Sequence, residues 1–121
     1  MGNKVLVVDD SGTMRKIVIR ALNAVGFSDT VEAGDGVDAL EMFKNSSIDI
    51  VLTDWNMPNK SGVDLAREIR ALGSTVPIFM ITTESEKGRV MEAIQAGVTD
   101  YLMKPFTQEV LQQKLEKYSL A

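Results

Sequence analysis

Four predicted β-strands of this sequence end in side chains that could do chemistry. Two carboxylates, Asp9 and Asp10, follow the run VLVV, and a third, Asp54, follows IDIVLT. The run PIFMIT ends in Thr82, and Lys104 follows DYLM. If these ends meet, three carboxylates contribute −3 and the ammonium contributes +1, which leaves a charge of −2. Packed carboxylates either raise a pKa or bind a cation.

These side chains suit a hard divalent cation with a phosphoryl group beside it. Oxygen ligands favour Mg²⁺, Mn²⁺ or Ca²⁺, and Mg²⁺ normally takes one or two carboxylates and keeps waters that phosphate oxygens can replace. The lysine and the threonine hydroxyl would stabilise that phosphate further. The chain holds no Cys and no His, which excludes zinc–thiolate sites, Ser-His-Asp triads and phosphohistidine. The expected nucleophile is therefore the carboxylate nearest to the cation, the lysine and the hydroxyl.

Each of these residues also has an ordinary structural explanation. An acidic pair after a strand often caps a helix, and a lone Asp at a strand end is commonly a turn residue. A single Thr or Lys in such a place is usually a cap or a solvated surface residue. The functional interpretation is favoured because the residues arrive together, at four strand ends, in an order that lets them meet.

Five strand–helix pairs are predicted to position these residues. Each short apolar run is followed by a segment in which apolar residues recur with helical spacing. Alternating strands and helices indicate an α/β fold, a five-stranded parallel sheet with helices on both faces. The strands are continuously apolar, as expected when both faces are buried. The predicted strands are residues 4–8, 30–33, 48–53, 77–82 and 100–103, and the predicted helices are residues 11–26, 36–44, 62–72, 86–96 and 107–118.

Some details of these helices are specific enough to be checked. Ser11 is a plausible N-cap and Gly26 a plausible stop for the first helix. An apolar stripe in that helix includes Ile17, and the third helix is expected to bury Leu72. Gly88 falls inside the predicted fourth helix, where glycine costs about 0.5–1 kcal/mol relative to Ala, so we expect that helix to be loose.

Length and composition bound the class of protein. The 121 residues suit one domain, expected to span residues 1–121. The net charge of −4 argues against nucleic-acid binding, and no apolar run is long enough to cross a bilayer. The N-terminus has no signal-peptide pattern. We therefore expect a cytoplasmic monomer that binds neither nucleic acid nor membrane.

From Asn3 to about Tyr118, the chain resembles the receiver domains of two-component response regulators. The motifs VLVVDD, DWNMPNKSG, MITTE and YLMKPFT carry the resemblance, in the right order and strand context. The segments DWNMPN, GDGVDALE and KPFT are especially similar to the chemotaxis-type single-domain regulators. The resemblance implies a flavodoxin-like (βα)5 fold.

The resemblance also implies roles at the matching positions. Asp54 would be the phosphoacceptor. Asp10, Asp54 and the backbone carbonyl of Asn56 would ligate Mg²⁺, with Asp9 acting through water. Lys104 would contact the phosphoryl group, through a peptide bond to Pro105 that is expected to be cis.

A second set of residues would carry the response and its rate. The resemblance implies that Thr82 moves to hydrogen-bond the phosphoryl oxygen and that Tyr101 turns inward behind it. Asn56, Thr83 and Glu84 would tune access to the site and the rate of dephosphorylation. Thr83 stands where the family usually has a smaller residue, commonly Ala.

As a receiver, the chain would be a signalling protein rather than an enzyme, although it would catalyse its own phosphorylation and slow dephosphorylation. A histidine kinase would donate the phosphoryl group. The face formed by the fourth helix, the fifth strand and the last helix would contact an output protein, such as a flagellar motor switch component.

Three alternatives belong beside this hypothesis. An aspartate-nucleophile phosphatase of the haloacid dehalogenase type would need a second Asp two residues after the first, where this chain has Asn56. A flavodoxin-like FMN carrier is disfavoured because Asp9 and Asp10 would repel the FMN phosphate. A receiver that serves another two-component pathway, or only drains phosphoryl groups from a shared kinase, stays open from the sequence.

Overall fold

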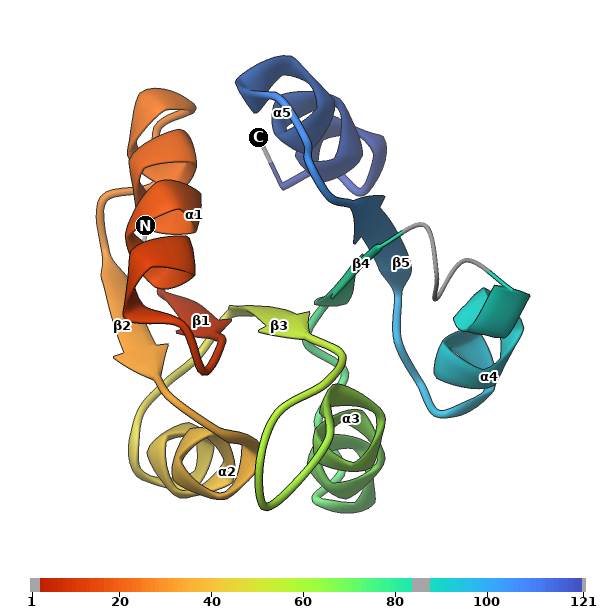
Figure 1. Ribbon diagram of the computed structural model, residues 1–121. Coiled ribbons are helices and arrows are strands. Elements are labelled where there is room, and N and C mark those ends of the chain that lie inside the picture. Colours follow the sequence, from red (N-terminus) through yellow and green to blue (C-terminus); the bar gives the residue numbers. More distant parts are fainter. Residues whose placement is uncertain (1–2, 84–87, 121) are drawn as a thin grey trace.

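The computed structural model describes residues 3–83 and 88–120, and strands and helices alternate along them (Figure 1). The predicted five strand–helix pairs are confirmed. The strands are β1 (Val5–Val8), β2 (Thr30–Ala33), β3 (Ile50–Asp54), β4 (Ile78–Thr82) and β5 (Asp100–Met103), and the helices are α1 (Gly12–Ala24), α2 (Gly36–Asn45), α3 (Gly62–Ala71), α4 (Val90–Gln95) and α5 (Gln108–Lys117).

The five strands form one parallel sheet in the order β2-β1-β3-β4-β5. This is the order of flavodoxin-like folds, as the resemblance implied. The chain moves from β1 to β2 on one side and then returns to place β3 on the other side of β1. In open α/β sheets, ligands bind at the carboxyl ends of the strands beside such a reversal. The residues that follow β1 and β3 are therefore the expected place for a site.

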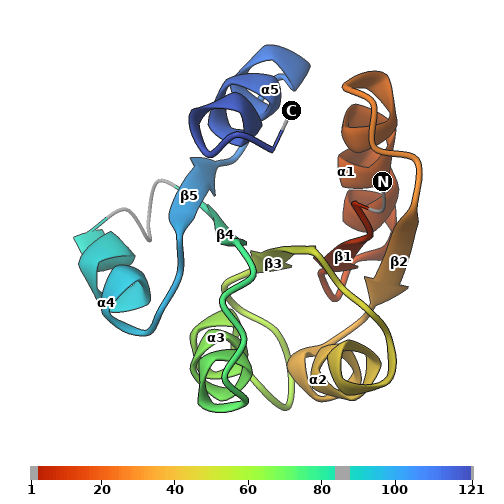
Figure 2. The same cartoon turned by 180° about the vertical axis from the view of Figure 1, so that it is seen from behind.

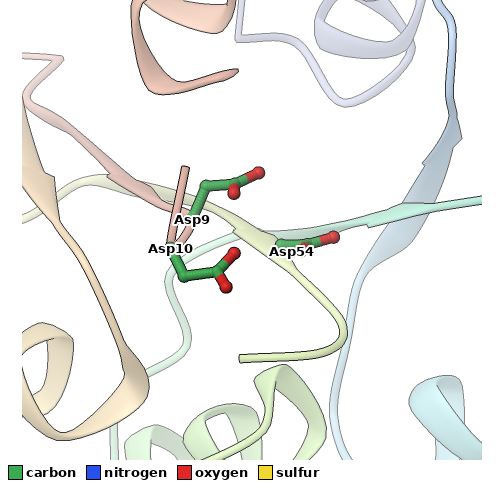
Figure 3. Close-up of side chains that lie close together, drawn as sticks. All are labelled: Asp9, Asp10 and Asp54. Atoms are coloured by element: carbon green, nitrogen blue, oxygen red, sulfur yellow. The ribbon is translucent and has the colours of Figure 1, made fainter. Parts of the chain in front are cut away.

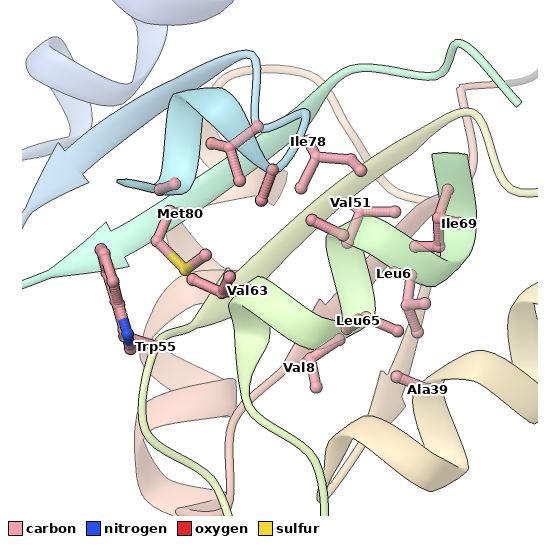
Figure 4. Packing of buried hydrophobic residues seen from close by; sticks show 14 of the residues in the cluster. Leu6, Val8, Ala39, Val51, Trp55, Val63, Leu65, Ile69, Ile78 and Met80 are labelled. Atoms are coloured by element: carbon pink, nitrogen blue, oxygen red, sulfur yellow. The ribbon is translucent and has the colours of Figure 1, made fainter. Parts of the chain in front are cut away.

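Helices cover both faces of the sheet, α1 and α5 on one face and α2, α3 and α4 on the other (Figures 1 and 2). Alternate strand residues feed two cores, because successive side chains point to opposite faces. Val5 and Val7 pack in the core that contains α1 and α5, while Leu6 and Val8 pack in the other core. Figure 4 shows that second core, in which Trp55 lies among buried residues of β4 and α3.

The helix ends follow the polar signals of the sequence. Ser11 caps α1, since its hydroxyl accepts a hydrogen bond from the amide of Met14 at 3.1 Å. Gly26 adopts a positive φ of 103° just after that helix, a conformation that glycine reaches without strain. Both predictions are confirmed. Of the described helices, none is long and apolar enough to cross a membrane.

Three predicted details of the helices are wrong. Ile17 is 49% exposed, because Val18 and Leu22 occupy the side of α1 that faces the sheet. Leu72 is 52% exposed, because it is the C-cap of α3 and lies beyond the last turn that packs on the core. Gly88 lies in a short 3₁₀ turn and not inside α4, because the α-helix begins at Val90. That α4 is loose stays a prediction.

Candidate functional site

The register of the sheet brings the predicted strand ends together. Val8 of β1 pairs with Thr53 of β3, so the next residues, Asp9 and Asp54, lie side by side. Thr82 ends β4 beside Met103, the last residue of β5, and Lys104 follows directly. Figure 3 shows Asp9, Asp10 and Asp54 gathered at this edge of the sheet. Parallel strands thus deliver residues far apart in the sequence to one place.

The three carboxylates form a compact cluster. One oxygen from each of Asp9, Asp10 and Asp54 lies within 4.8 Å of the others. Asp9 is only 2% exposed, and burial, with the neighbouring charge of Asp54, raises its pKa above the ordinary value. Its Oδ1 accepts a hydrogen bond from the amide of Ser11 at 2.9 Å. Its Oδ2 is buried and has no hydrogen-bond partner among the described residues.

This arrangement fits a hard divalent cation. The group of Asp9, Asp10, Asp54 and Lys104 carries a charge of −2 when its acids are ionised, so one such cation would neutralise it. Buried polar oxygens without partners are uncommon in native proteins, and Oδ2 of Asp9 points to an interaction that the described residues do not supply. An all-oxygen donor set is what Mg²⁺ prefers.

Lys104 pairs with one of the three carboxylates, Asp54. Its Nζ lies 3.2 Å from Asp54 Oδ1, and both side chains are mostly shielded from solvent. Its backbone amide donates to the carbonyl of Thr82 at 2.6 Å, which fixes the start of the loop after β5. The peptide bond between Lys104 and Pro105 is cis, as expected.

The contacts recorded for Thr82 and Tyr101 lie outside the carboxylate cluster. Thr82 is fully buried, and its hydroxyl lies 3.9 Å from the sulfur of Met103, a weak acceptor. Tyr101 is half-buried, and the ammonium of Lys114 lies 4.5 Å from the centre of its ring.

Two of the three positions expected to tune access are described, and they differ in exposure. Asn56 is exposed and follows Trp55 in the loop after β3, and Thr83 is half-buried just after β4. Glu84 lies outside the described residues.

Gly62 closes the loop after β3 against the site, and the sequence analysis did not single it out. Its amide donates to the carbonyl of Trp55 at 2.9 Å. A Cβ at this position would collide with the backbone carbonyl oxygen of Asp54 and with the sulfur of Met80. A side chain here would push directly on the backbone of Asp54, so the close approach requires glycine.

A hydrogen bond links two loops beside the site, and the sequence analysis did not predict it. Asn59 Nδ2 donates to Asp35 Oδ2 at 2.7 Å, while the other oxygen of Asp35 caps α2 through the amide of Asp38. Asn59 adopts a positive φ of 70°, which Asn tolerates better than most residues. The one feature of the sequence that could have indicated this contact is Asn59 itself, which stands in a loop rich in turn-forming residues.

Arg89 covers the residue next to Asp54. The guanidinium carbon of Arg89 lies 4.7 Å from the centre of the Trp55 ring, and Arg89 Nε also donates to Glu92 at 3.2 Å. Arg89 is the N-cap of α4 and makes no side-chain cap hydrogen bond. The start of α4 thus contacts the loop that follows β3. No short-range pattern in the sequence pairs these residues.

Comparison with known proteins agrees with the fold and the acidic cluster. The response regulator receiver domain model matches residues 5–116. The chain therefore belongs to the response regulator receiver domain family. Members of this family are signalling proteins rather than enzymes in the usual sense.

Within that family the chain is of the CheY type. It is 48% identical over 116 residues to the chemotaxis protein CheY-3 of Vibrio cholerae, covering 94% of this chain and 89% of the relative. It is 46% identical to the chemotaxis protein CheY of Pseudomonas aeruginosa, covering 94% of each chain. Among solved structures, the receiver domain of the Pseudomonas aeruginosa sensor histidine kinase PA1611 is 31% identical, with a TM-score of 0.85 and 98% of each chain covered. That structure has a magnesium ion coordinated in its active-site cleft.

Proposed function

We propose that this chain is a phosphorylation-activated switch, in which Asp54 accepts a phosphoryl group from a histidine kinase in a Mg²⁺-dependent reaction. The single observation that carries the proposal is the position of Asp54, with its Oδ1 at 3.2 Å from the ammonium of Lys104 and inside the carboxylate cluster. Among the described residues, Asp54 is the one carboxylate that belongs to the cluster and also pairs with Lys104.

The transfer would be a displacement at phosphorus. A carboxylate oxygen of Asp54 attacks the phosphorus of the kinase phosphohistidine and forms a P–O bond. The P–N bond breaks, and the imidazole nitrogen keeps its electron pair and takes a proton. Lys104 stabilises the negative charge on the phosphoryl oxygens. A bound Mg²⁺, held by Asp10, Asp54 and the carbonyl of Asn56 with Asp9 acting through water, would supply the remaining charge neutralisation.

Slow hydrolysis would return the protein to its resting state. Water attacks the phosphorus, the P–O bond to Asp54 breaks, and the carboxylate and inorganic phosphate are released. We propose that Asn56, Thr83 and Glu84 set the rate of this step through access of water to the acyl phosphate. The amide of Asn56 is no general acid, which separates this chain from the phosphatase alternative.

The switch would follow from the new phosphoryl oxygens. The acceptor recorded for the Thr82 hydroxyl among the described residues is the Met103 sulfur, so a phosphoryl oxygen would offer it a stronger acceptor. Movement of Thr82 would make room for Tyr101 to turn inward. The change at Asp54 would then reach the surface formed by α4, β5 and α5.

We propose that this surface contacts an output protein in chemotaxis, such as a flagellar motor switch component, in the cytoplasm and as a monomer. The proposal rests on the CheY relatives named above. Large apolar side chains exposed on α4 and α5 suit such contact: Met91, Ile94 and Val110. Output in another two-component pathway, or service as a phosphate sink, is the alternative.

Trp55 allows a direct test, because it is the only tryptophan and follows Asp54 in the chain. We expect Mg²⁺ to change its fluorescence, and acetyl phosphate to change it again only when Mg²⁺ is present. The second change should be absent in Asp54→Asn and intact in Asp49→Asn, a substitution outside the cluster. A protein whose fluorescence ignores both additions would contradict the proposal.

A further inference from the structure

Asp100, the first residue of β5, organises a polar network beside Tyr101. Its carboxylate is buried and accepts hydrogen bonds from the amide of Tyr101 at 2.8 Å and from the hydroxyl of Tyr118 at 2.6 Å. The ammonium of Lys114 lies 3.1 Å from Asp100 Oδ1. Burial alone would raise the pKa of Asp100, but these hydrogen bonds and Lys114 outweigh it and lower the pKa, so the carboxylate is ionised at neutral pH.

Lys114 lies between this carboxylate and the ring of Tyr101. Its ammonium is 4.5 Å from the ring centre, a separation at which a cation is attracted to the aromatic face. The side chain of Lys114 is only 23% exposed, so water screens the contact less than at an open surface. Asp100 keeps the ammonium in place even if the ring departs.

Lys117 provides a natural comparison on the same helix. Its ammonium lies 3.5 Å from Asp100 Oδ2, but its ring contact is with Tyr118, at 5.5 Å from the ring centre. Its side chain is 63% exposed. Both lysines therefore pair with one carboxylate, and each contacts a different tyrosine.

We propose that Lys114 is a positioning residue for Tyr101: anchored by Asp100, it holds the ring in its half-buried position and opposes the inward turn of the switch. The inference rests on the proposed function, in which Tyr101 turns inward after phosphorylation. Every inward turn breaks the contact with the ammonium and leaves the contact with Asp100 intact. The lysine therefore biases the equilibrium between the two ring positions toward the resting one.

The two ring positions can be distinguished because the chain has only two tyrosines. Protein labelled with 3-fluorotyrosine gives two ¹⁹F resonances, and Tyr118→Phe assigns them. Beryllium fluoride with Mg²⁺ mimics the phosphoryl group, so its titration moves the Tyr101 resonance from the resting to the switched position. The variants are Lys114→Gln, Lys114→Arg and the matched control Lys117→Gln.

We expect Lys114→Gln to move the resting Tyr101 resonance toward its switched position. The beryllium fluoride concentration at half-saturation should fall about two- to fivefold, the size of one cation–aromatic contact near a surface. Lys114→Arg should behave as the wild type. Lys117→Gln should alter the Tyr118 resonance and leave the titration unchanged. Asp100→Asn removes the anchor and should shift Tyr101 in the same direction as Lys114→Gln.

The titrations distinguish failure of the positioning role of Lys114 from failure of the proposed switch. If Tyr101 responds to beryllium fluoride in the wild type and Lys114→Gln titrates identically, the positioning role is wrong and the switch stands. If Lys117→Gln shifts the titration as much as Lys114→Gln, a general charge effect replaces the proposed ring contact. If the wild-type Tyr101 resonance does not respond at all, the switch itself is wrong, and the role of Lys114 is wrong with it.

Discussion

Lys104 Nζ lies 3.2 Å from Asp54 Oδ1, so the lysine after β5 pairs with the carboxylate at the end of β3, across the intervening strand β4. The pair places a cation beside one oxygen of Asp54 and leaves Asp9 and Asp10 facing the same site. A lysine in this place can stabilise an incoming phosphoryl group without itself holding a metal ion.

Replacement of Lys104 should distinguish metal binding from phosphoryl transfer. Lys104→Ala removes a positive charge beside the cluster, so Mg²⁺ affinity should not fall, while phosphorylation by acetyl phosphate or the switch should be impaired. Trp55 fluorescence measures the first effect, and intact mass together with the response of Tyr101 measures the second. Lys16→Ala, on the exposed surface of α1, is the control. A Lys104→Ala protein that phosphorylates and switches normally would show that Lys104 is not the phosphoryl contact.

Gly62 should tolerate no side chain. Gly62→Ala sets a Cβ against the carbonyl of Asp54, and we expect a loss of about 1–3 kcal/mol in the free energy of unfolding, measured by urea denaturation. Gly88→Ala is the matched control, because a Cβ there meets no atom of the described chain within 4 Å. Equal stability of the two variants would mean that the loop after β3 can move away from Asp54.

Asn59 combines a hydrogen bond with an unusual backbone conformation. Asn59→Gly loses the bond to Asp35 but keeps the positive φ without strain, whereas Asn59→Ala loses both. Urea denaturation should therefore find Asn59→Ala less stable than Asn59→Gly, by about 1 kcal/mol. The reverse order would indicate that the loop relaxes out of the left-handed conformation.

The pair of Tyr118 and Asp100 predicts a dependence of stability on pH. The hydrogen bond to Asp100, together with burial, raises the pKa of Tyr118 from 10.0 to about 12. The stabilisation that this hydrogen bond gives the folded state is complete below pH 10.0 and is lost as the pH rises toward about 12. The reason is that deprotonation of Tyr118 costs more free energy in the folded than in the unfolded state.

Tyr118→Phe isolates this contribution, since the variant loses the hydroxyl and keeps Asp100, Lys114 and Lys117. The difference in free energy of unfolding between wild type and variant should be about 1 kcal/mol at neutral pH and should shrink above pH 10.0. At the acid end it should shrink as the pH falls through the lowered pKa of Asp100. A difference that does not change with pH would mean that this hydrogen bond does not contribute to stability.

The fold could be predicted from the sequence because the signals for strands and helix ends are local and recur along the chain. The strands VLVV, IVL and IFMI are apolar throughout, and Ser11 and Gly26 mark the ends of α1. Ile17 and Leu72 were wrongly predicted to be buried. Helical periodicity identifies the apolar side of a helix but does not show how much of that side packs against the sheet.

The part of the candidate site that lies at the ends of the strands could be predicted from the sequence. Parallel pairing obliges Asp9, Asp54 and Lys104 to meet, whatever surrounds them. The contact of Arg89 with Trp55 and the bond between Asn59 and Asp35 depend on how loops pack in three dimensions. No spacing in the sequence encodes such contacts.

The central claim is that Asp54 becomes an acyl phosphate, and reductive trapping tests it most directly. The protein is incubated with acetyl phosphate and Mg²⁺, and borohydride then reduces the acyl phosphate to an alcohol, which converts the modified aspartate to homoserine. Peptide mass spectrometry should find homoserine at position 54 alone, and only when Mg²⁺ was present. Homoserine at Asp9 or Asp10 instead, or at no position, would contradict the claim.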